Sequence, residues 1–121
     1  DSYKLIPYYS VSVITSAAVN YSDLSKYYPK GSKDKDILTC MKNRCRKILQ
    51  LAIINNNEGI VLGAFGCGVF GNKPEDISKI FKELLVDEFY GKFFTKVVFA
   101  IKGTPGKYNP NYDAFKAAFK P

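Results

Sequence analysis

The stretch with the clearest chemical potential is the glycine-spaced segment 59–72, which begins as a short apolar run and leads through Lys73 and Pro74 into a periodic helix. Its glycines stand at positions 63, 66, 68 and 71. Small residues let the backbone approach an anion closely, and the N–H groups can then point at it. A helix that starts directly afterwards adds positive potential. The segment therefore predicts either a phosphate-binding loop or a strand-to-helix connection whose glycines only allow close packing, and spacing alone does not separate the two.

Several other kinds of site are disfavoured by the sequence. No Gly-Lys-Ser/Thr follows the glycines, so the loop is not a Walker A motif, and the glycine spacing does not match the dinucleotide fingerprint. The chain has no histidine, which excludes Ser-His-Asp and Cys-His catalysis and disfavours zinc. Cys67 has no basic partner nearby in the sequence, so we interpret it as a small residue tolerated in a tight loop rather than a nucleophile. We expect no catalytic residue, no metal and no cofactor within this chain.

Length and composition favour a single domain over residues 1–121, because 121 residues suffice for one core but hardly for two. No apolar run approaches the roughly 20 residues that a membrane-spanning helix needs, so we expect a soluble protein with no membrane partner. Three cysteines, an odd number, argue against a disulfide framework and for a reducing compartment. We therefore expect a cytoplasmic location, with the nucleus as the alternative. Because the first residue is Asp1 rather than Met, we also expect a fragment or a trimmed chain.

The net charge of +7 favours an anionic partner without naming one. Many of the positive charges lie between Lys26 and Lys47. A solvated basic helix face is the favoured interpretation, and a surface that binds nucleic acid or another polyanion is the alternative.

The elements that must position the glycine segment follow from hydrophobic periodicity and from breaker residues. We expect an extended lead-in, then a strand at 11–15, a loop at 21–36, and a helix that starts at Asp34 or Asp36 and ends near Asn55. After the strand at 60–62 and the glycine loop, Pro74 opens a helix, and an apolar run at 97–101 predicts a strand buried on both faces. A turn at 102–106 precedes a last helix capped by Asn109.

This alternation of strands and helices indicates an α/β layered fold with mostly parallel strands and right-handed crossovers. In such sheets, ligands bind beyond the carboxyl ends of the strands. The loops that leave those ends are 16–20, 63–72 and 102–106, so the glycine loop is where a ligand is expected.

The segment from Leu62 to Pro74 closely resembles the diphosphate loop of microbial-type poly(ADP-ribose) glycohydrolases, which are macrodomain-fold proteins. Their pattern is Gly-Ala-Trp/Phe-Gly-Cys-Gly-Val-Phe-x-Asn-x-Pro. The resemblance extends to the strand end at 13–20, to the helix at 44–49 and to the last strand at 97–101. It implies a three-layer macrodomain-like α/β fold with a mostly parallel or mixed sheet.

The resemblance also implies a site. Loop residues would hold the diphosphate of ADP-ribose through backbone N–H groups, Phe70 would pack beside a ribose, and residues near Lys102 would flank the adenine. The implied partner is ADP-ribose or poly(ADP-ribose). The implied ligand-binding residues are Gly66, Cys67, Gly68, Val69, Phe70 and Gly71.

One departure from the family is large. Its catalytic signature, a Gly-Gly-Gly segment followed by Gln-Glu-Glu, lies upstream of the region that matches 11–20, and this sequence has no such segment. None of the glutamates, at positions 58, 75, 83 and 88, matches the catalytic pair. The general acid that protonates the leaving ribose oxygen is therefore not supplied here. The chain looks like the C-terminal part of the domain without its N-terminal strands.

Three functions remain open at this point. The chain could belong to a glycohydrolase that cleaves O-glycosidic ADP-ribose linkages if the upstream catalytic segment is present. It could be a non-catalytic module that binds ADP-ribose or a related nucleotide. It could instead be a degenerate structural domain whose exposed sheet edges pair with another chain, which would also allow oligomers.

Overall fold

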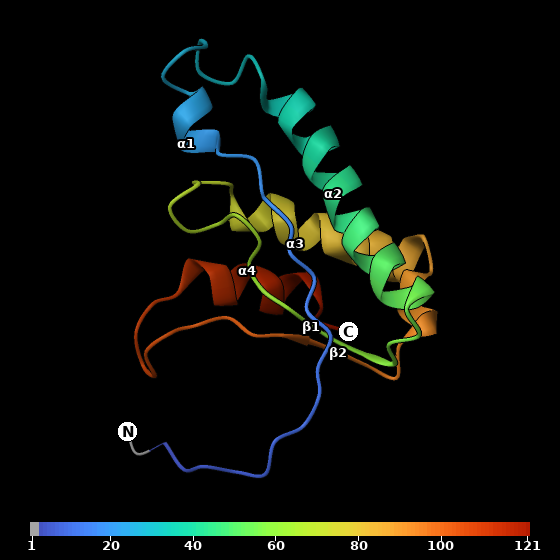
Figure 1. Ribbon diagram of the computed structural model, residues 1–121. Helices are drawn as coiled ribbons and strands as arrows, with labels where there is room; N and C mark the ends of the chain where they lie inside the picture. Colours follow the sequence, from blue (N-terminus) through green and yellow to red (C-terminus); the bar gives the residue numbers. More distant parts are fainter. Residues whose placement is uncertain (1–2) are drawn as a thin grey trace.

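The computed structural model describes residues 3–121. Figure 1 shows the elements in chain order: α1 (Tyr21–Leu24), α2 (Asp34–Ile54), β1 (Gly59–Leu62), α3 (Pro74–Lys82), the π-helical turn η1 (Glu83–Asp87), the 3₁₀ turn η2 (Tyr90–Phe93), β2 (Lys96–Phe99) and α4 (Pro110–Ala118). β1 and β2 are parallel and in register from Gly59 opposite Lys96 to Leu62 opposite Phe99. The expected α/β class is confirmed, because the helices pack with a small parallel sheet.

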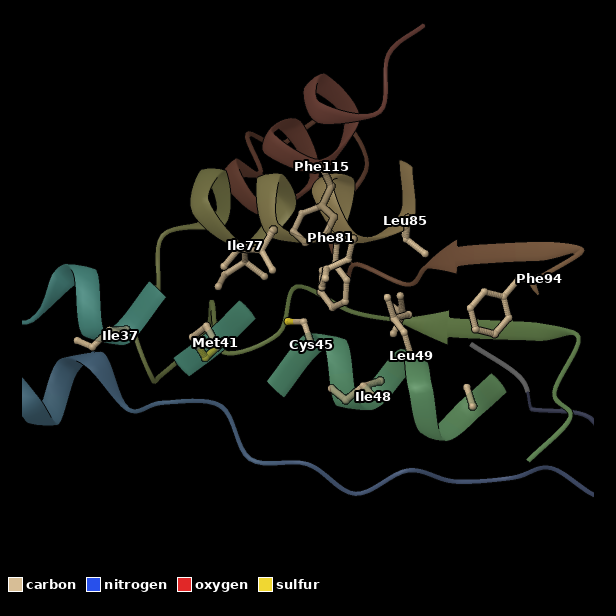
Figure 2. Packing of buried hydrophobic residues seen from close by; sticks show 14 residues of the cluster. Ile37, Met41, Cys45, Ile48, Leu49, Ile77, Phe81, Leu85, Phe94 and Phe115 are labelled. Atoms are coloured by element: carbon tan, nitrogen blue, oxygen red, sulfur yellow. The ribbon is translucent and has the colours of Figure 1, made fainter. Parts of the chain in front are cut away.

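The core is built mainly from one face of α2 and one face of α3. Met41, Cys45 and Leu49 recur every four residues on α2, and all three are fully buried. They face Ile77 and Phe81 of α3, as Figure 2 shows. The periodic apolar positions therefore fix how α2 and α3 pack. This packing also positions the chain segment that joins the two helices.

An aromatic cluster joins β2 to the last two helices. The ring of Phe99 lies 5.5 Å from that of Phe81, 4.9 Å from that of Phe115 and 5.0 Å from that of Phe119. Offset and edge contacts at these separations are the favourable geometry for aromatic pairs. β2 is thus held against α3 and α4 by side chains as well as by its ladder with β1.

Two of the expected helix starts are confirmed. Pro74 occupies the first turn of α3, where its missing N–H costs nothing. The side chain of Asn109 accepts a hydrogen bond from the N–H of Tyr112 at 3.2 Å and so caps α4. Residues 21–36, expected to be a loop, also contain the single turn α1, which the side chain of Asn20 caps through the N–H of Asp23.

Two strand predictions need correction. Residues 11–15 form no strand, because no ladder partner lies beside them among residues 3–121, and β propensity alone does not make a strand. β2 is not buried on both faces: Val98 remains 36% exposed, since α3 and α4 cover only the face that carries Phe99.

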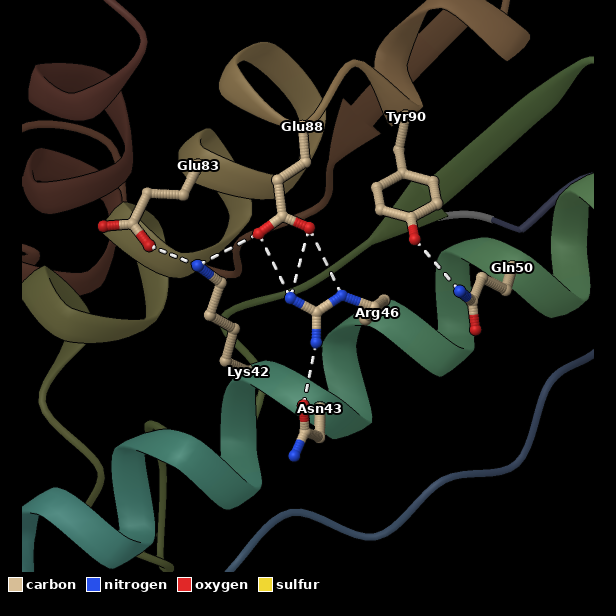
Figure 3. A network of polar contacts seen from close by, with 7 residues as sticks. All are labelled: Lys42, Asn43, Arg46, Gln50, Glu83, Glu88 and Tyr90. Carbon is tan, nitrogen blue, oxygen red and sulfur yellow. Dashed lines mark hydrogen bonds and ion pairs between the residues drawn. The ribbon is translucent and has the colours of Figure 1, made fainter.

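A polar network ties α2 to the end of the α3–η1 segment (Figure 3). The ammonium of Lys42 lies 2.9 Å from a carboxylate oxygen of Glu83 and 3.1 Å from one of Glu88. The guanidinium of Arg46 donates from two nitrogens to the same Glu88 carboxylate. The hydrogen bond from Lys42, joined by that from Arg46, outweighs partial burial and holds the pKa of Glu88 below its usual range. These positive charges of the basic segment therefore serve as structural ion pairs.

Within residues 3–121, no helix is both long enough and apolar enough to cross a bilayer.

Candidate anion-binding site

The glycine loop leaves the carboxyl end of β1 and returns to the first turn of α3, beside α1 (Figure 1). Its carbonyl at Phe70 accepts a hydrogen bond from the N–H of Ser22 at 3.0 Å, which fastens the outer part of the loop to α1. Because β1 and β2 run parallel, the segment after β2 leaves the same edge of the sheet. The loop therefore lies where ligands bind in open α/β sheets.

Internal hydrogen bonds fold the loop without any ligand. The N–H of Cys67 bonds to the carbonyl of Ala64, and the N–H of Gly71 bonds to the carbonyl of Gly68, each at 3.0 Å. The N–H of Asn72 then closes the loop onto the carbonyl of Gly66 at 3.1 Å. These turns fix the direction of the remaining amides.

In the turn at residues 66–72, four N–H groups have no hydrogen-bond acceptor among residues 3–121: those of Gly66, Gly68, Val69 and Phe70. The last three are consecutive and belong to exposed residues, and the side chain of Val69 is 92% exposed. Successive backbone amides in a turn form a concave, positively polarised surface that suits an anion. A phosphate oxygen could accept from them at no cost to the fold.

The glycines divide into two kinds by their surroundings. Gly66 and Gly71 have φ of 73° and 71°, and a side chain there would collide with Ala18 and Ser22, respectively. These two positions require glycine for the shape of the loop. Gly68 has no positive φ, and a Cβ added to it meets no atom within 4 Å. The absence of a side chain at Gly68 therefore leaves open space next to the free amides.

The side chain of Asn72 holds the glycine loop in place through two hydrogen bonds, whereas the sequence predicts only that this residue precedes a helix. It is 6% exposed, and its side-chain amide donates to the carbonyl of Val19 at 2.7 Å and to that of Gly66 at 2.9 Å. This residue joins the loop to the segment 16–20, the first of the three loops expected at this edge. The sequence does not predict this role, because it depends on the burial of Asn72 against Val19, 53 residues away, where the side-chain amide must satisfy its hydrogen bonds.

Cys67 is half-buried in the loop and packs against the hydrophobic core. Burial, with the nearby charges of Glu75 and Asp76, raises the pKa of Cys67 to about 11. The thiol therefore stays protonated at neutral pH, which agrees with its interpretation as a small loop residue and not a nucleophile.

Three of the four glutamates lie away from this loop. Glu83 and Glu88 are ion-paired to α2, and Glu58 precedes β1 at the opposite end of the strand. Glu75 is exposed in the first turn of α3. Among residues 3–121, no three histidine, cysteine or acidic side chains cluster where they could hold a metal ion.

The fold and the loop together define an α/β domain of the macrodomain-like kind, with a turn of free amides at the carboxyl edge of its sheet. Bacterial poly(ADP-ribose) glycohydrolases share this structure. The enzyme of Deinococcus radiodurans in complex with ADP-ribose superposes with a TM-score of 0.75 at 28% identity, over 87% of this chain and 40% of that one. The enzyme of Thermomonospora curvata superposes with a TM-score of 0.71 at 33% identity, over 84% of this chain and 36% of that one.

This chain thus spans about two-fifths of the length of those proteins. The resemblance to part of a microbial-type glycohydrolase domain, expected from the loop motif, is confirmed. No family profile and no curated protein matches the sequence.

Proposed function

We propose that this chain binds ADP-ribose, with the diphosphate held by the free amides of the glycine loop. The donors would be the N–H groups of Gly66, Gly68, Val69 and Phe70, while Cys67 and Gly71 complete the turn through their internal bonds. Phe70, 37% exposed, would lie beside a ribose. The observation that carries the proposal is the exposed run of amides at 68–70, in a chain that superposes on a protein crystallised with ADP-ribose.

The proposed biological role is that of the ligand-binding part of an ADP-ribose glycohydrolase. Cleavage of an O-glycosidic linkage needs a general acid beside the leaving oxygen. The four glutamates of this sequence do not provide one, so turnover would depend on a Gly-Gly-Gly…Gln-Glu-Glu segment outside it. If the full coding sequence contains that segment, the glycohydrolase is favoured over a module that only binds ADP-ribose.

A non-catalytic ADP-ribose-binding module is the second candidate. The internal hydrogen bonds of the loop hold the amides in place without any catalytic residue, so binding by itself does not require the Gly-Gly-Gly…Gln-Glu-Glu segment. The two candidates share the same binding site and differ only in what surrounds it.

Calorimetry with ADP-ribose, AMP and adenosine tests the binding proposal. AMP lacks one phosphate together with the distal ribose, and adenosine lacks both phosphates, so each loses charge-assisted hydrogen bonds. AMP should therefore bind at least about tenfold more weakly than ADP-ribose, and adenosine more weakly still. The proposal fails if ADP-ribose gives no binding isotherm, or if adenosine binds as tightly as ADP-ribose.

A further inference from the structure

The face of α2 that points away from the core is strongly basic. Residues 26–47 include eight of the 18 lysines and arginines of the chain and two of its 11 acidic residues. Two of the eight are used in the ion pairs between α2 and the α3–η1 segment that Figure 3 shows. Lys35, Arg44 and Lys47 form no ion pair with any carboxylate of residues 3–121. Their charges therefore do not serve the packing of α2.

A shallow groove of about 460 Å³ runs along this face, and all the residues that line it belong to α2. Lys35 and Lys47 stand at its two ends, about 18 Å apart along the helix axis. Arg44 lies between them, and its guanidinium is held by a hydrogen bond of 2.6 Å to the carbonyl of Ala17. The groove thus presents a row of three cations, one of which is fixed in place.

An exposed aromatic ring borders the Lys35 end of the groove. The carboxylate of Asp36, the single acidic side chain in the described lining, pairs with the ammonium of Lys33 at 3.7 Å. The same ammonium lies 5.1 Å from the centre of the Tyr28 ring. Lys33 therefore offsets the charge of Asp36 and holds Tyr28, which is 45% exposed, next to the groove.

We propose that this groove binds the backbone of a single-stranded nucleic acid, with a base stacked on Tyr28. A row of cations suits successive phosphates, and an exposed ring beside it suits an unpaired base. An acidic peptide would have no use for the ring, and a membrane surface would need apolar side chains where this lining is polar. Poly(ADP-ribose) carries its charges as diphosphates, which converging amides such as those of the glycine loop suit better than separate side chains. The proposal goes beyond ADP-ribose binding and does not depend on it.

Fluorescein-labelled single-stranded RNA and DNA of one mixed sequence, about 12 nucleotides long, are the probes for anisotropy titrations of the full chain. The logarithm of the binding constant should fall with that of the salt concentration with a slope of about −2, because three cations each displace about 0.7 counterion from a single strand. The complementary duplex should bind at least about fivefold more weakly, because its bases cannot stack on Tyr28. Poly(ADP-ribose) should also bind more weakly, and excess ADP-ribose should not displace the probe. No binding of either probe, a slope near zero, equal affinity for the duplex or the polymer, or displacement by ADP-ribose overturns the proposal.

Matched variants separate the groove from the overall charge. Lys47→Gln should weaken binding at least about threefold at low salt and make the slope shallower by about 0.7. Lys79→Gln removes an equally exposed lysine from α3 and should change neither quantity. Tyr28→Ala should weaken binding at least about fivefold, whereas Tyr28→Phe keeps the ring and should bind within about twofold of the unmodified chain. Equal effects of the two lysine variants, or of the two Tyr28 variants, contradict the proposal.

Cys40 reports on the groove in the unmodified chain. It is half-buried in the lining, whereas burial raises the pKa of Cys45 to about 12 and that of Cys67 to about 11. Iodoacetamide should therefore react first at Cys40. Bound nucleic acid should slow this reaction at least about fivefold and leave the slow reaction of Cys67 unchanged. Alkylation of Cys40 at the same rate with and without the bound strand overturns the assignment to this groove, even if a variant does not fold.

Discussion

The substitution Gly68→Val separates a binding role of the glycine loop from a packing role. A Cβ at this position meets no atom within 4 Å, and Gly68 has no positive φ, so valine fits the fold without strain. The new side chain would instead occupy the space beside the free amides of Gly68 and Val69. The variant should therefore lose the ligand and keep the structure.

The size of the loss follows from the hydrogen bonds it prevents. A hydrogen bond to a charged group contributes about 1.5–3 kcal/mol. If two bonds to the diphosphate are lost, and the lower value applies because the loop is exposed, binding weakens by about 3 kcal/mol, or roughly 100-fold in Kd. The free energy of unfolding should change by less than about 1 kcal/mol.

Calorimetry with ADP-ribose and urea unfolding, run on the same preparations, measure the two quantities. Gly59→Val is the matched control, because it makes the same substitution at the opposite end of β1, where a Cβ meets only the carbonyl of Lys96 at 3.7 Å. It should bind ADP-ribose like the unmodified chain. If Gly68→Val binds within about threefold of the unmodified chain, the diphosphate does not lie on these amides and the site assignment is wrong.

Three further outcomes are expected. Asn72→Ala removes two side-chain hydrogen bonds, to the carbonyls of Val19 and Gly66, which each keep one backbone donor. At about 0.5–1.5 kcal/mol for each bond, the substitution should cost about 1–3 kcal/mol of stability and weaken ADP-ribose binding, and unchanged melting and affinity would show that these bonds do not hold the loop. Leu49→Ala should cost about 2–5 kcal/mol in urea unfolding, because Leu49 is fully buried, whereas Leu51→Ala on the exposed side of the same helix should cost far less; equal losses would contradict the packing of α2. The pKa of Glu88 is lowered in the folded chain, so its contribution to stability is complete above its ordinary pKa of 4.5 and is lost as pH falls through the lowered value. Glu88→Gln should therefore flatten the acid side of the stability profile, and an unchanged profile would mean that the Lys42 pair does not stabilise the fold.

The helices of this chain were predictable because their signals are local. The periodicity of Met41 and Cys45 gives the buried face of α2, and Pro74 and Asn109 mark the starts of α3 and α4. A helix satisfies its backbone within its own segment, so the pattern of one segment is enough. The expected start and end of α2 differ from the observed ones by no more than two residues.

The strand at 11–15 could not be judged in the same way. A strand exists only with a neighbour, and the β-branched run at 11–15 carries no information on whether one is present. The same limit applies to the burial of Val98, which depends on what covers its face of the sheet. Both incorrect predictions depend on neighbours that are distant in the sequence and that a local pattern cannot reveal.

The place of the glycine loop between β1 and α3 was predictable from the sequence, and its internal organisation was not. Glycine spacing located the loop, but the spacing cannot tell that Gly66 and Gly71 shape the turn while Gly68 leaves space. That distinction depends on Ala18 and Ser22, which reach the loop from some 50 residues away in the sequence. The buried amide of Asn72 likewise has its partner at Val19.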